Sequence, residues 1–109
     1  MRRIRKRYIA LHIDSVQHLD EKRLMKAIWG KVYQLFGEVG ASQTALSKID
    51  YNKEQAILVI RCSHKRLEST IAATAAITEV DDEESVALRV VAVSGTLKAL
   101  RNKLSKRQC

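Results

Sequence analysis

Apolar and polar side chains alternate near the start of the chain, over residues 7–14. The aliphatic positions are Ile9, Leu11 and Ile13, and the positions between them are Tyr8, Ala10 and His12. A period of two is typical of a β-strand with one buried face. We therefore expect a first strand with one aliphatic face and one mixed, partly exposed face.

Helical spacing replaces this alternation after Asp20. The apolar residues form two neighbouring lines, which are Leu24, Ile28, Val32, Leu35 and Phe36, and then Met25, Trp29 and Tyr33. Such a stripe is wider than a surface helix needs, so the helix is expected to contact two layers or a partner. Asp20 is a suitable N-cap, with Leu19 and Leu24 placed as a hydrophobic staple. Gly37 and Gly40 are expected to end the helix in a turn that can continue as a short helix.

The next segments predict a hairpin followed by a helix. Residues 46–51 and 55–62 have the composition of two strands joined by a short polar turn. Residues 57–60 are apolar throughout, as in a central strand covered on both faces. Ser63 is expected to cap a helix over residues 63–78. The buried line of that helix is expected to be Leu67, Ile71, Thr74 or Ala75, and Thr78.

The last part of the chain predicts a strand and a basic helix. Residues 81–84 are all acidic and are expected to form a turn before a strand over residues 86–93. Ser94, Gly95 and Thr96 are expected to open the final helix. Its inner positions are Leu97, Leu100 and Leu104, and its outer positions include Lys98, Arg101, Lys103, Lys106 and Arg107.

The predicted order is strand, helix, strand, strand, helix, strand, with an added C-terminal helix. This is the split βαβ pattern, so we expect an α+β fold, a sandwich of the RNA-recognition-motif or ferredoxin-like kind with a four-stranded antiparallel sheet. The 109 residues suit one domain, with a basic arm at residues 1–6 and a basic helix at residues 95–109. Helices are expected to cover one sheet face and to leave the other for RNA, a partner or the final helix.

The charge balance is the first indication of function. The chain has 20 Lys and Arg against 12 Asp and Glu, a net charge of +8, and a pI near 9.8. A domain this basic favours nucleic acid as a partner. Its two cysteines, Cys62 and Cys109, are too few for a disulfide framework, and no stretch resembles a signal peptide or a membrane span. We expect a cytoplasmic protein in a reducing compartment, with no membrane partner.

Three basic regions are candidates for phosphate contacts. The candidate residues are Arg2, Arg3, Arg5, Lys6 and Arg7 in the N-terminal arm, Arg61, His64, Lys65 and Arg66 at the strand-to-helix corner, and Lys98, Arg101 and Lys103 in the final helix. Each cation that neutralises a phosphate releases condensed counterions. A solvated tail, ordinary capping and a favourable helix dipole explain part of the same pattern without RNA.

Catalytic and metal sites have weaker support. Cys62 and His64 raise the idea of a nucleophile and its base, but no third residue is placed to orient the histidine. Zinc is disfavoured because a paired ligand set is missing. The acidic run at residues 81–84 suits a solvated turn better than a Mg²⁺ site. We expect no catalytic residue and no metal or cofactor in this chain.

The predicted central strand contains no aromatic residue. The usual RNA-recognition domains stack bases on sheet aromatics, so binding here is expected to depend on RNA shape and backbone. The apolar sheet face then needs another explanation, and a protein partner that covers it is the natural one. Trp29, Tyr33 and Phe36 are the candidate protein-interface residues.

Several short motifs together resemble a known family. They are residues 6–11, Ala27-Ile28-Trp29, Phe36-Gly37 with Gly40-Ala41, Arg61-Cys62-Ser63-His64, and Val93-Ser94-Gly95-Thr96-Leu97-Lys98. Their order and spacing resemble the ribonuclease P protein component 2 family, the archaeal counterpart of a eukaryotic subunit shared by ribonucleases P and MRP. The resemblance covers nearly the whole chain.

The resemblance implies an RNA-recognition-motif-like topology and membership of a ribonucleoprotein that removes the 5′ leader of precursor tRNA. It implies that the RNA subunit is the catalyst and uses Mg²⁺, and that this chain touches precursor tRNA only indirectly. It further implies pairing with protein component 3 in a two-plus-two assembly, beside other ribonuclease P proteins. Two alternatives stay open: a protein scaffold whose charge only aids solubility, and a stand-alone nuclease that uses His64.

Overall fold

The computed structural model describes residues 5–15, 20–80 and 84–107. The elements in chain order are β1 (Lys6–Ser15), α1 (Glu21–Gln43), β2 (Ser47–Asn52), β3 (Ile57–Ser63), the 3-10 turn η1 (His64–Arg66), α2 (Leu67–Ala75), β4 (Glu79–Val80), β5 (Glu84–Ser94) and α3 (Leu97–Arg107). The sheet order is β2-β3-β1-β5-β4, and every neighbouring pair is antiparallel. This confirms the predicted α+β sandwich and adds a short fifth strand, β4.

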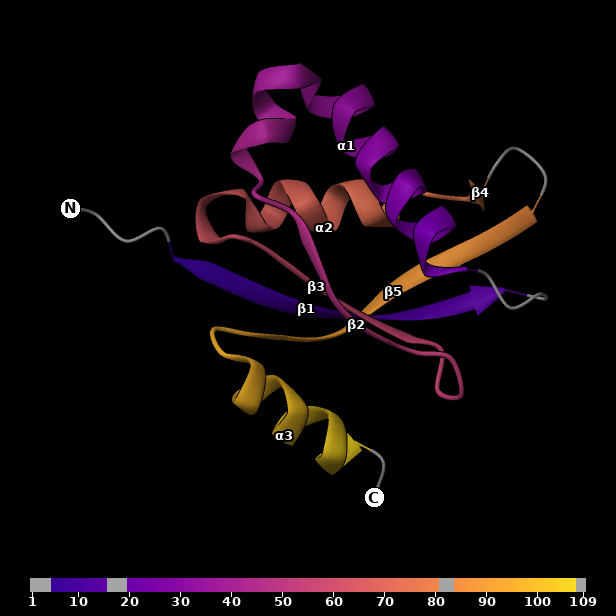
Figure 1. Ribbon diagram of the computed structural model, residues 1–109, viewed down its shortest axis with the longest axis vertical. Helices are drawn as coiled ribbons and strands as arrows, with labels where there is room; N and C mark the ends of the chain where they lie inside the picture. The colour runs from indigo at the N-terminus through magenta and orange to yellow at the C-terminus, as the bar shows by residue number, and fades with distance from the viewer. Residues whose placement is uncertain (1–4, 16–19, 81–83, 108–109) are drawn as a thin grey trace.

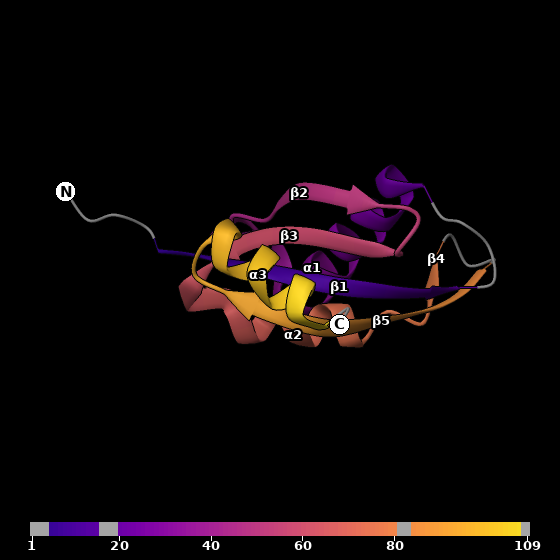
Figure 2. The ribbon, with the colours of Figure 1, turned by 90° about the horizontal axis from the view of Figure 1, so that it is seen from below.

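The molecule has three layers. Helices α1 and α2 lie on one face of the sheet and α3 lies on the other, as Figure 1 shows. Viewed from below in Figure 2, α3 runs across the sheet close to β1 and β5. No helix within the described ranges is long and apolar enough to cross a membrane.

The main core fills the space between the sheet and the helices α1 and α2. Its fully buried side chains include Ile9, Leu11, Leu24, Ile28, Val32, Leu58 and Ile60. The aliphatic positions predicted for the first strand are therefore its buried face. Leu24, Ile28 and Val32 confirm the inner line of α1, because each has no exposed surface. Leu35 does not belong to that line, since its side chain is 48% exposed.

A second, smaller core lies between the sheet and α3. It is built on Ala10, Val59 and Leu100, with Leu97 and Leu104 packed against them. The three leucines predicted for the inner side of the last helix are thus confirmed. The structure also answers what covers the second sheet face, because the C-terminal helix does so.

Helix α1 begins as predicted but extends further. The Asp20 carboxylate accepts a hydrogen bond from the main-chain N–H of Lys22, so the predicted N-cap is confirmed; the proposed staple partner Leu19 lies outside the described residues. Gly37 has φ 74° and ψ −178° and kinks the helix instead of ending it. The helix resumes to Gln43, as the alternative of a continued short helix allowed.

The prediction for the second helix was wrong at both ends. The Ser63 side chain makes no capping hydrogen bond; Ser63 is buried, and its main-chain N–H donates to the Thr44 carbonyl at 2.7 Å. The 3-10 turn η1 comes first, and α2 ends at Ala75 because the chain turns into β4. The buried residues of α2 are Thr70, Ala73 and Thr74, whereas Leu67 and Ile71 are half-buried and Thr78 is exposed.

Two bulges shift the side-chain alternation. The β2–β3 register shifts between Lys48 and Asp50, and the β1–β5 register shifts between Ala10 and Leu11. A bulge adds one residue to one strand and moves the following side chains to the other face. Ile49 therefore packs in the α3-side core while Tyr51 packs against the main core.

Candidate nucleic-acid interface

Three segments far apart in the sequence meet at one end of the sheet. Lys6 pairs with Ser63, and Tyr8 pairs with Ser94, so the start of β1 lies between the end of β3 and the end of β5. Helix α3 therefore starts near the beginning of β1, as both ribbon views show (Figures 1 and 2). We call this end the basic edge and define it by its described cationic or titratable residues, which are Arg5, Lys6, Arg7, His64, Lys65 and Arg66.

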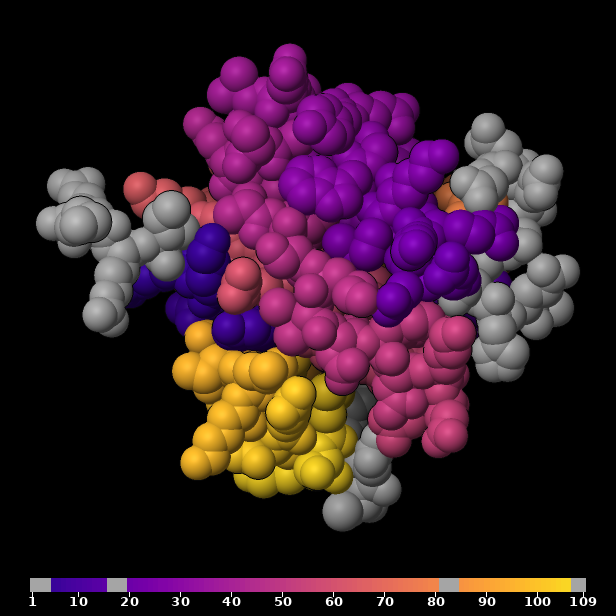
Figure 3. All heavy atoms as spheres, viewed as in Figure 1, coloured from indigo at the N-terminus to yellow at the C-terminus, as the bar shows by residue number. Residues whose placement is uncertain are grey.

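Direct contacts hold the basic edge together. Arg7 Nε donates a hydrogen bond to Nδ1 of His64 at 2.9 Å, and the main-chain N–H of His64 donates to the Arg5 carbonyl at 2.8 Å. The Arg7 guanidinium also lies against Gly95 at the β5–α3 turn. In the space-filling view, the indigo start of β1 borders the start of α3 (Figure 3). The described part of the predicted arm (residues 5–7) and the 3-10 turn of the predicted corner (residues 64–66) therefore form one surface.

The charges of the basic edge remain accessible. Arg5, His64 and Lys65 are exposed, whereas Lys6, Arg7 and Arg66 are half-buried. The Arg66 guanidinium donates a hydrogen bond to the side-chain amide of Gln43 at the end of α1. A surface with several cations on adjacent elements attracts polyanions, and its field adds to that of the whole basic domain.

The remaining predicted RNA contacts are not among the residues that define the basic edge. Arg61 faces the α3 side of the sheet opposite Tyr8, and its Nε is buried without a hydrogen-bond partner among the described residues. Lys98 lies in the first turn of α3, and Arg101 is exposed further along the helix. Lys103 Nζ donates to the Val93 carbonyl at 2.7 Å. Arg2 and Arg3 lie outside the described residues.

Cys62 and His64 do not form a reactive pair. The Cys62 thiol is fully buried in the main core, and His64 is exposed and turned toward Arg7. Burial raises the pKa of the Cys62 thiol, although a hydrogen bond to Thr70 and the charge of Lys6 oppose the shift. A protonated, enclosed thiol is a poor nucleophile. Within the described ranges no group of three His, Cys, Asp or Glu is placed to hold a metal ion; residues 81–83 of the acidic run lie outside them.

Helix α1 carries an exposed apolar surface. Tyr33 and Leu35 are each 48% exposed, and Val39 beyond the kink is 70% exposed. The Tyr33 ring centroid lies 6.1 Å from that of Trp29, at an interplanar angle of 39°. Trp29 and Phe36 are only partly exposed because they pack against the main core. The exposure of Val39 was not predicted from the sequence, because the kink at Gly37 changes which residues face outward.

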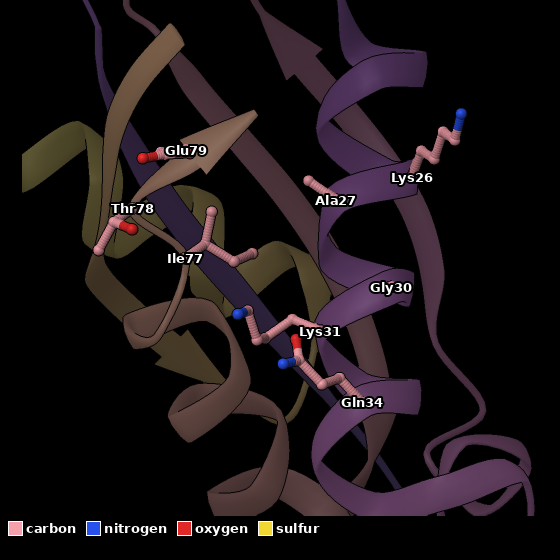
Figure 4. A pocket seen from close by; sticks show the side chains of 8 residues that line it. All are labelled: Lys26, Ala27, Gly30, Lys31, Gln34, Ile77, Thr78 and Glu79. Carbon is pink, nitrogen blue, oxygen red and sulfur yellow. The ribbon is translucent and has the colours of Figure 1, made fainter. Parts of the chain in front are cut away.

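An open groove of about 480 Å³ separates α1 from the α2–β4 connection. Figure 4 shows Lys31 and Gln34 reaching from α1 toward Ile77, whereas Lys26 points away from the groove. Its lining mixes polar and apolar side chains and includes one acidic residue, Glu79. None of the residues that line it belongs to the basic edge.

The layered fold and its cationic end define a basic α+β protein of RNA-recognition-motif-like topology. The profile of the Rpp14/Pop5 family matches residues 7–105, and the chain belongs to this family. The family of ribonuclease P protein component 2, to which the sequence motifs pointed, is thereby confirmed.

Individual relatives agree with this assignment. Ribonuclease P protein component 2 of Archaeoglobus fulgidus is 34% identical over 102 residues, which cover 93% of this chain and 89% of that protein. The protein of the same name from Pyrococcus furiosus is 26% identical over 101 residues, 93% of this chain and 83% of that protein. A chain in the cryo-EM structure of yeast ribonuclease MRP superposes with a TM-score of 0.70 at 12% identity, over 99% of this chain and 95% of that chain. The last comparison shows a shared fold.

Proposed function

We propose that this protein is a non-catalytic subunit of ribonuclease P, the ribonucleoprotein that removes the 5′ leader of precursor tRNA. In this role it binds and stabilises the catalytic domain of the RNA subunit together with protein component 3. Membership of the family and the names of its relatives support the assembly. The observation that carries the RNA-binding part is the convergence of Arg5, Arg7 and Lys65 at one end of the sheet.

The proposed mechanism is electrostatic. Folded RNA brings phosphates close together, and their mutual repulsion opposes compact structure. Cations fixed on a rigid surface neutralise these phosphates and release counterions. The basic edge therefore lowers the cost of the active RNA fold, and the RNA subunit holds the Mg²⁺ ions and performs the cleavage.

The covered sheet face supports recognition of RNA backbone over base stacking. Helix α3 packs on the face where an RNA-recognition motif usually presents aromatic side chains to bases. Tyr8 on that face is half-buried and packs in the α3-side core. Phosphate contacts at the edge of the sheet need no free face.

The exposed apolar surface of α1 is the proposed site for the protein partner. Tyr33 and Val39 lie on it, with Trp29 beside Tyr33. Aromatic side chains such as Trp29 and Tyr33 are enriched at the centres of protein interfaces. Protein component 3 is the partner expected from the family, in the two-plus-two assembly. This surface and the basic edge are formed by different elements, so one chain can bind RNA and protein together.

Charge-neutralising variants test the RNA contact. We expect Arg5→Gln, Arg7→Gln and Lys65→Gln together to weaken binding to the cognate ribonuclease P RNA at least about tenfold. The salt slope should fall by roughly 0.7–0.9 for each phosphate that the variant no longer neutralises. The control carries Lys22→Gln, Lys26→Gln and Lys53→Gln, which remove the same charge from exposed positions outside the edge. Both variants are measured by RNA binding at several salt concentrations.

The same measurement also tests the scaffold alternative. If both triple variants reduce affinity and salt slope equally, only net charge matters and the basic edge is not an RNA contact. A protein scaffold without RNA contact is then the better interpretation, and the exposed apolar surface of α1 is the observation that favours it.

A further inference from the structure

The Arg7 side chain is held by two residues that are far from it in the sequence. Its Nε donates to Nδ1 of His64 at 2.9 Å. Its Nη1 lies so close to Gly95 that a Cβ on that residue would clash with it. Arg7 therefore joins three elements, namely β1, η1 and the turn between β5 and α3.

His64 can hold Arg7 only as a neutral acceptor. A neutral imidazole carries a proton on one ring nitrogen and a lone pair on the other. Because Arg7 donates to Nδ1, the proton of His64 belongs on Nε2. The main-chain N–H of His64 is itself bound to the Arg5 carbonyl at 2.8 Å, so the acceptor is fixed in position. This arrangement places His64 as a support for Arg7.

Gly95 is needed for space and not for backbone conformation. Among the described glycines, only Gly37 has a positive φ. The nearest atoms to a Cβ at Gly95 both belong to the end of the Arg7 side chain. A larger residue would displace a flexible side chain and leave the fold intact.

A fixed guanidinium is well suited to phosphate. Arg has five N–H donors in one plane, and the hydrogen bond to His64 uses the donor on Nε. The two terminal nitrogens keep their donors, which match phosphate oxygens. Holding the side chain before binding reduces the conformational entropy that binding would otherwise remove.

We infer that His64 and Gly95 are positioning residues that hold the Arg7 guanidinium as a preorganised phosphate ligand at the basic edge. The inference deepens the proposed RNA-binding function and rests on it. His64, which sequence analysis placed among the RNA contacts, then acts mainly through Arg7. Gly95, which sequence analysis assigned to helix opening, has a second role at the same site.

A double-mutant cycle on Arg7 and His64 tests this inference. The probe is the cognate ribonuclease P RNA, and the readout is its dissociation constant. We expect His64→Ala to weaken binding about fivefold in the natural background, within the coupling range of contacting residues. In an Arg7→Lys background, where no guanidinium is present, the same change should have less than about a twofold effect. His64→Asn, whose amide oxygen stands near the position of Nδ1, should restore most of the affinity.

The substitution Gly95→Ala provides a second, independent test. We expect it to weaken RNA binding in the natural background and to have no effect when combined with Arg7→Ala, while the melting temperature stays close to that of the unchanged protein. This second test keeps the inference testable if His64→Ala lowers the fraction of folded protein.

The outcomes separate the inference from the function it rests on. If Arg7→Ala weakens binding but His64→Ala and Gly95→Ala act equally with and without Arg7, the positioning role is wrong and the RNA contact stands. If Arg7→Ala leaves RNA affinity unchanged, both the positioning role and the RNA contact at this residue are wrong.

Discussion

Cys62 and its neighbours show how strongly environment differs between adjacent residues. The side chain of Cys62 is enclosed in the main core, while Arg61 faces α3 and His64 is exposed at the basic edge. The sequence shows these residues as one cluster of candidate chemistry. The strand alternation and the 3-10 turn after Ser63 divide them among three surroundings.

The enclosed thiol predicts a defined pH dependence. Burial raises the pKa of Cys62, so the folded chain keeps the thiol protonated to higher pH than the unfolded chain does. The protonated thiol makes its full contribution to the free energy of unfolding below about pH 8.5, where an unfolded thiol ionises. This contribution is lost as the pH rises through the raised pKa of the folded state. We expect the difference in unfolding free energy between the natural protein and Cys62→Ala to shrink above that pH.

Urea unfolding of both proteins at a series of pH values measures this difference. The pKa of Tyr51 is also raised, first by its burial and then by the charges of Asp20 and Glu21. Its contribution is present in both proteins and cancels in the comparison. A difference that stays the same from neutral to alkaline pH would show that the thiol ionises equally in both states.

The start of helix α1 was predictable from the sequence, but its continuation beyond Gly37 was not. The Asp20 cap is visible in the sequence because the capping residue and the apolar spacing lie close together. The continuation past Gly37 depends on tertiary contacts, since Ala41 returns to the main core with no exposed surface. Thr44 then closes the helix with a hydrogen bond from its Oγ1 to the Ala41 carbonyl at 2.6 Å.

Two glycines in α1 predict opposite effects of the same substitution. Gly37 has φ 74° and ψ −178°, a region that is essentially restricted to glycine, so Gly37→Ala should destabilise the protein by about 1–3 kcal/mol. Gly30 lies in a regular, exposed part of the helix, with no atom within 4 Å of an added Cβ. Gly30→Ala should therefore stabilise the protein by roughly 0.5–1 kcal/mol.

Thermal or urea unfolding of the two variants provides the measurement. The natural protein is the common reference, and each variant adds one methyl group. Equal effects of the two substitutions would show that the kink at Gly37 does not require glycine.

At the scale of the whole molecule, the order of elements and the fold class were predictable because the periodicities are clear. The pattern could not show β4, whose two residues are too few for a periodic signal. It also left open what covers the second sheet face, because the docking of α3 depends on the α3-side core around Leu100.

The candidate site was predictable in its charges and not in its arrangement. The sequence indicated three basic regions, but the antiparallel register decides that residues 5–7 and residues 64–66 become one surface. The Arg7–His64 contact joins residues 57 positions apart, which no local pattern reveals. Of the residues on the exposed apolar surface of α1, Tyr33 was predicted from the sequence. The exposure of Val39 was not, because it depends on the kink at Gly37.

Cleavage by a reconstituted ribonuclease P particle tests most directly whether the basic edge supports the catalytic RNA. The ribonuclease P RNA and the other protein subunits are combined with this chain, with the Arg5→Gln/Arg7→Gln/Lys65→Gln variant, or with the control Lys22→Gln/Lys26→Gln/Lys53→Gln. Removal of the 5′ leader is then followed at several Mg²⁺ concentrations. We predict that the natural chain and the control raise the rate and lower the Mg²⁺ requirement, and that the basic-edge variant needs more Mg²⁺ to reach the same rate. Equal cleavage with the basic-edge variant at every Mg²⁺ concentration, or cleavage by this chain without RNA, would contradict the account.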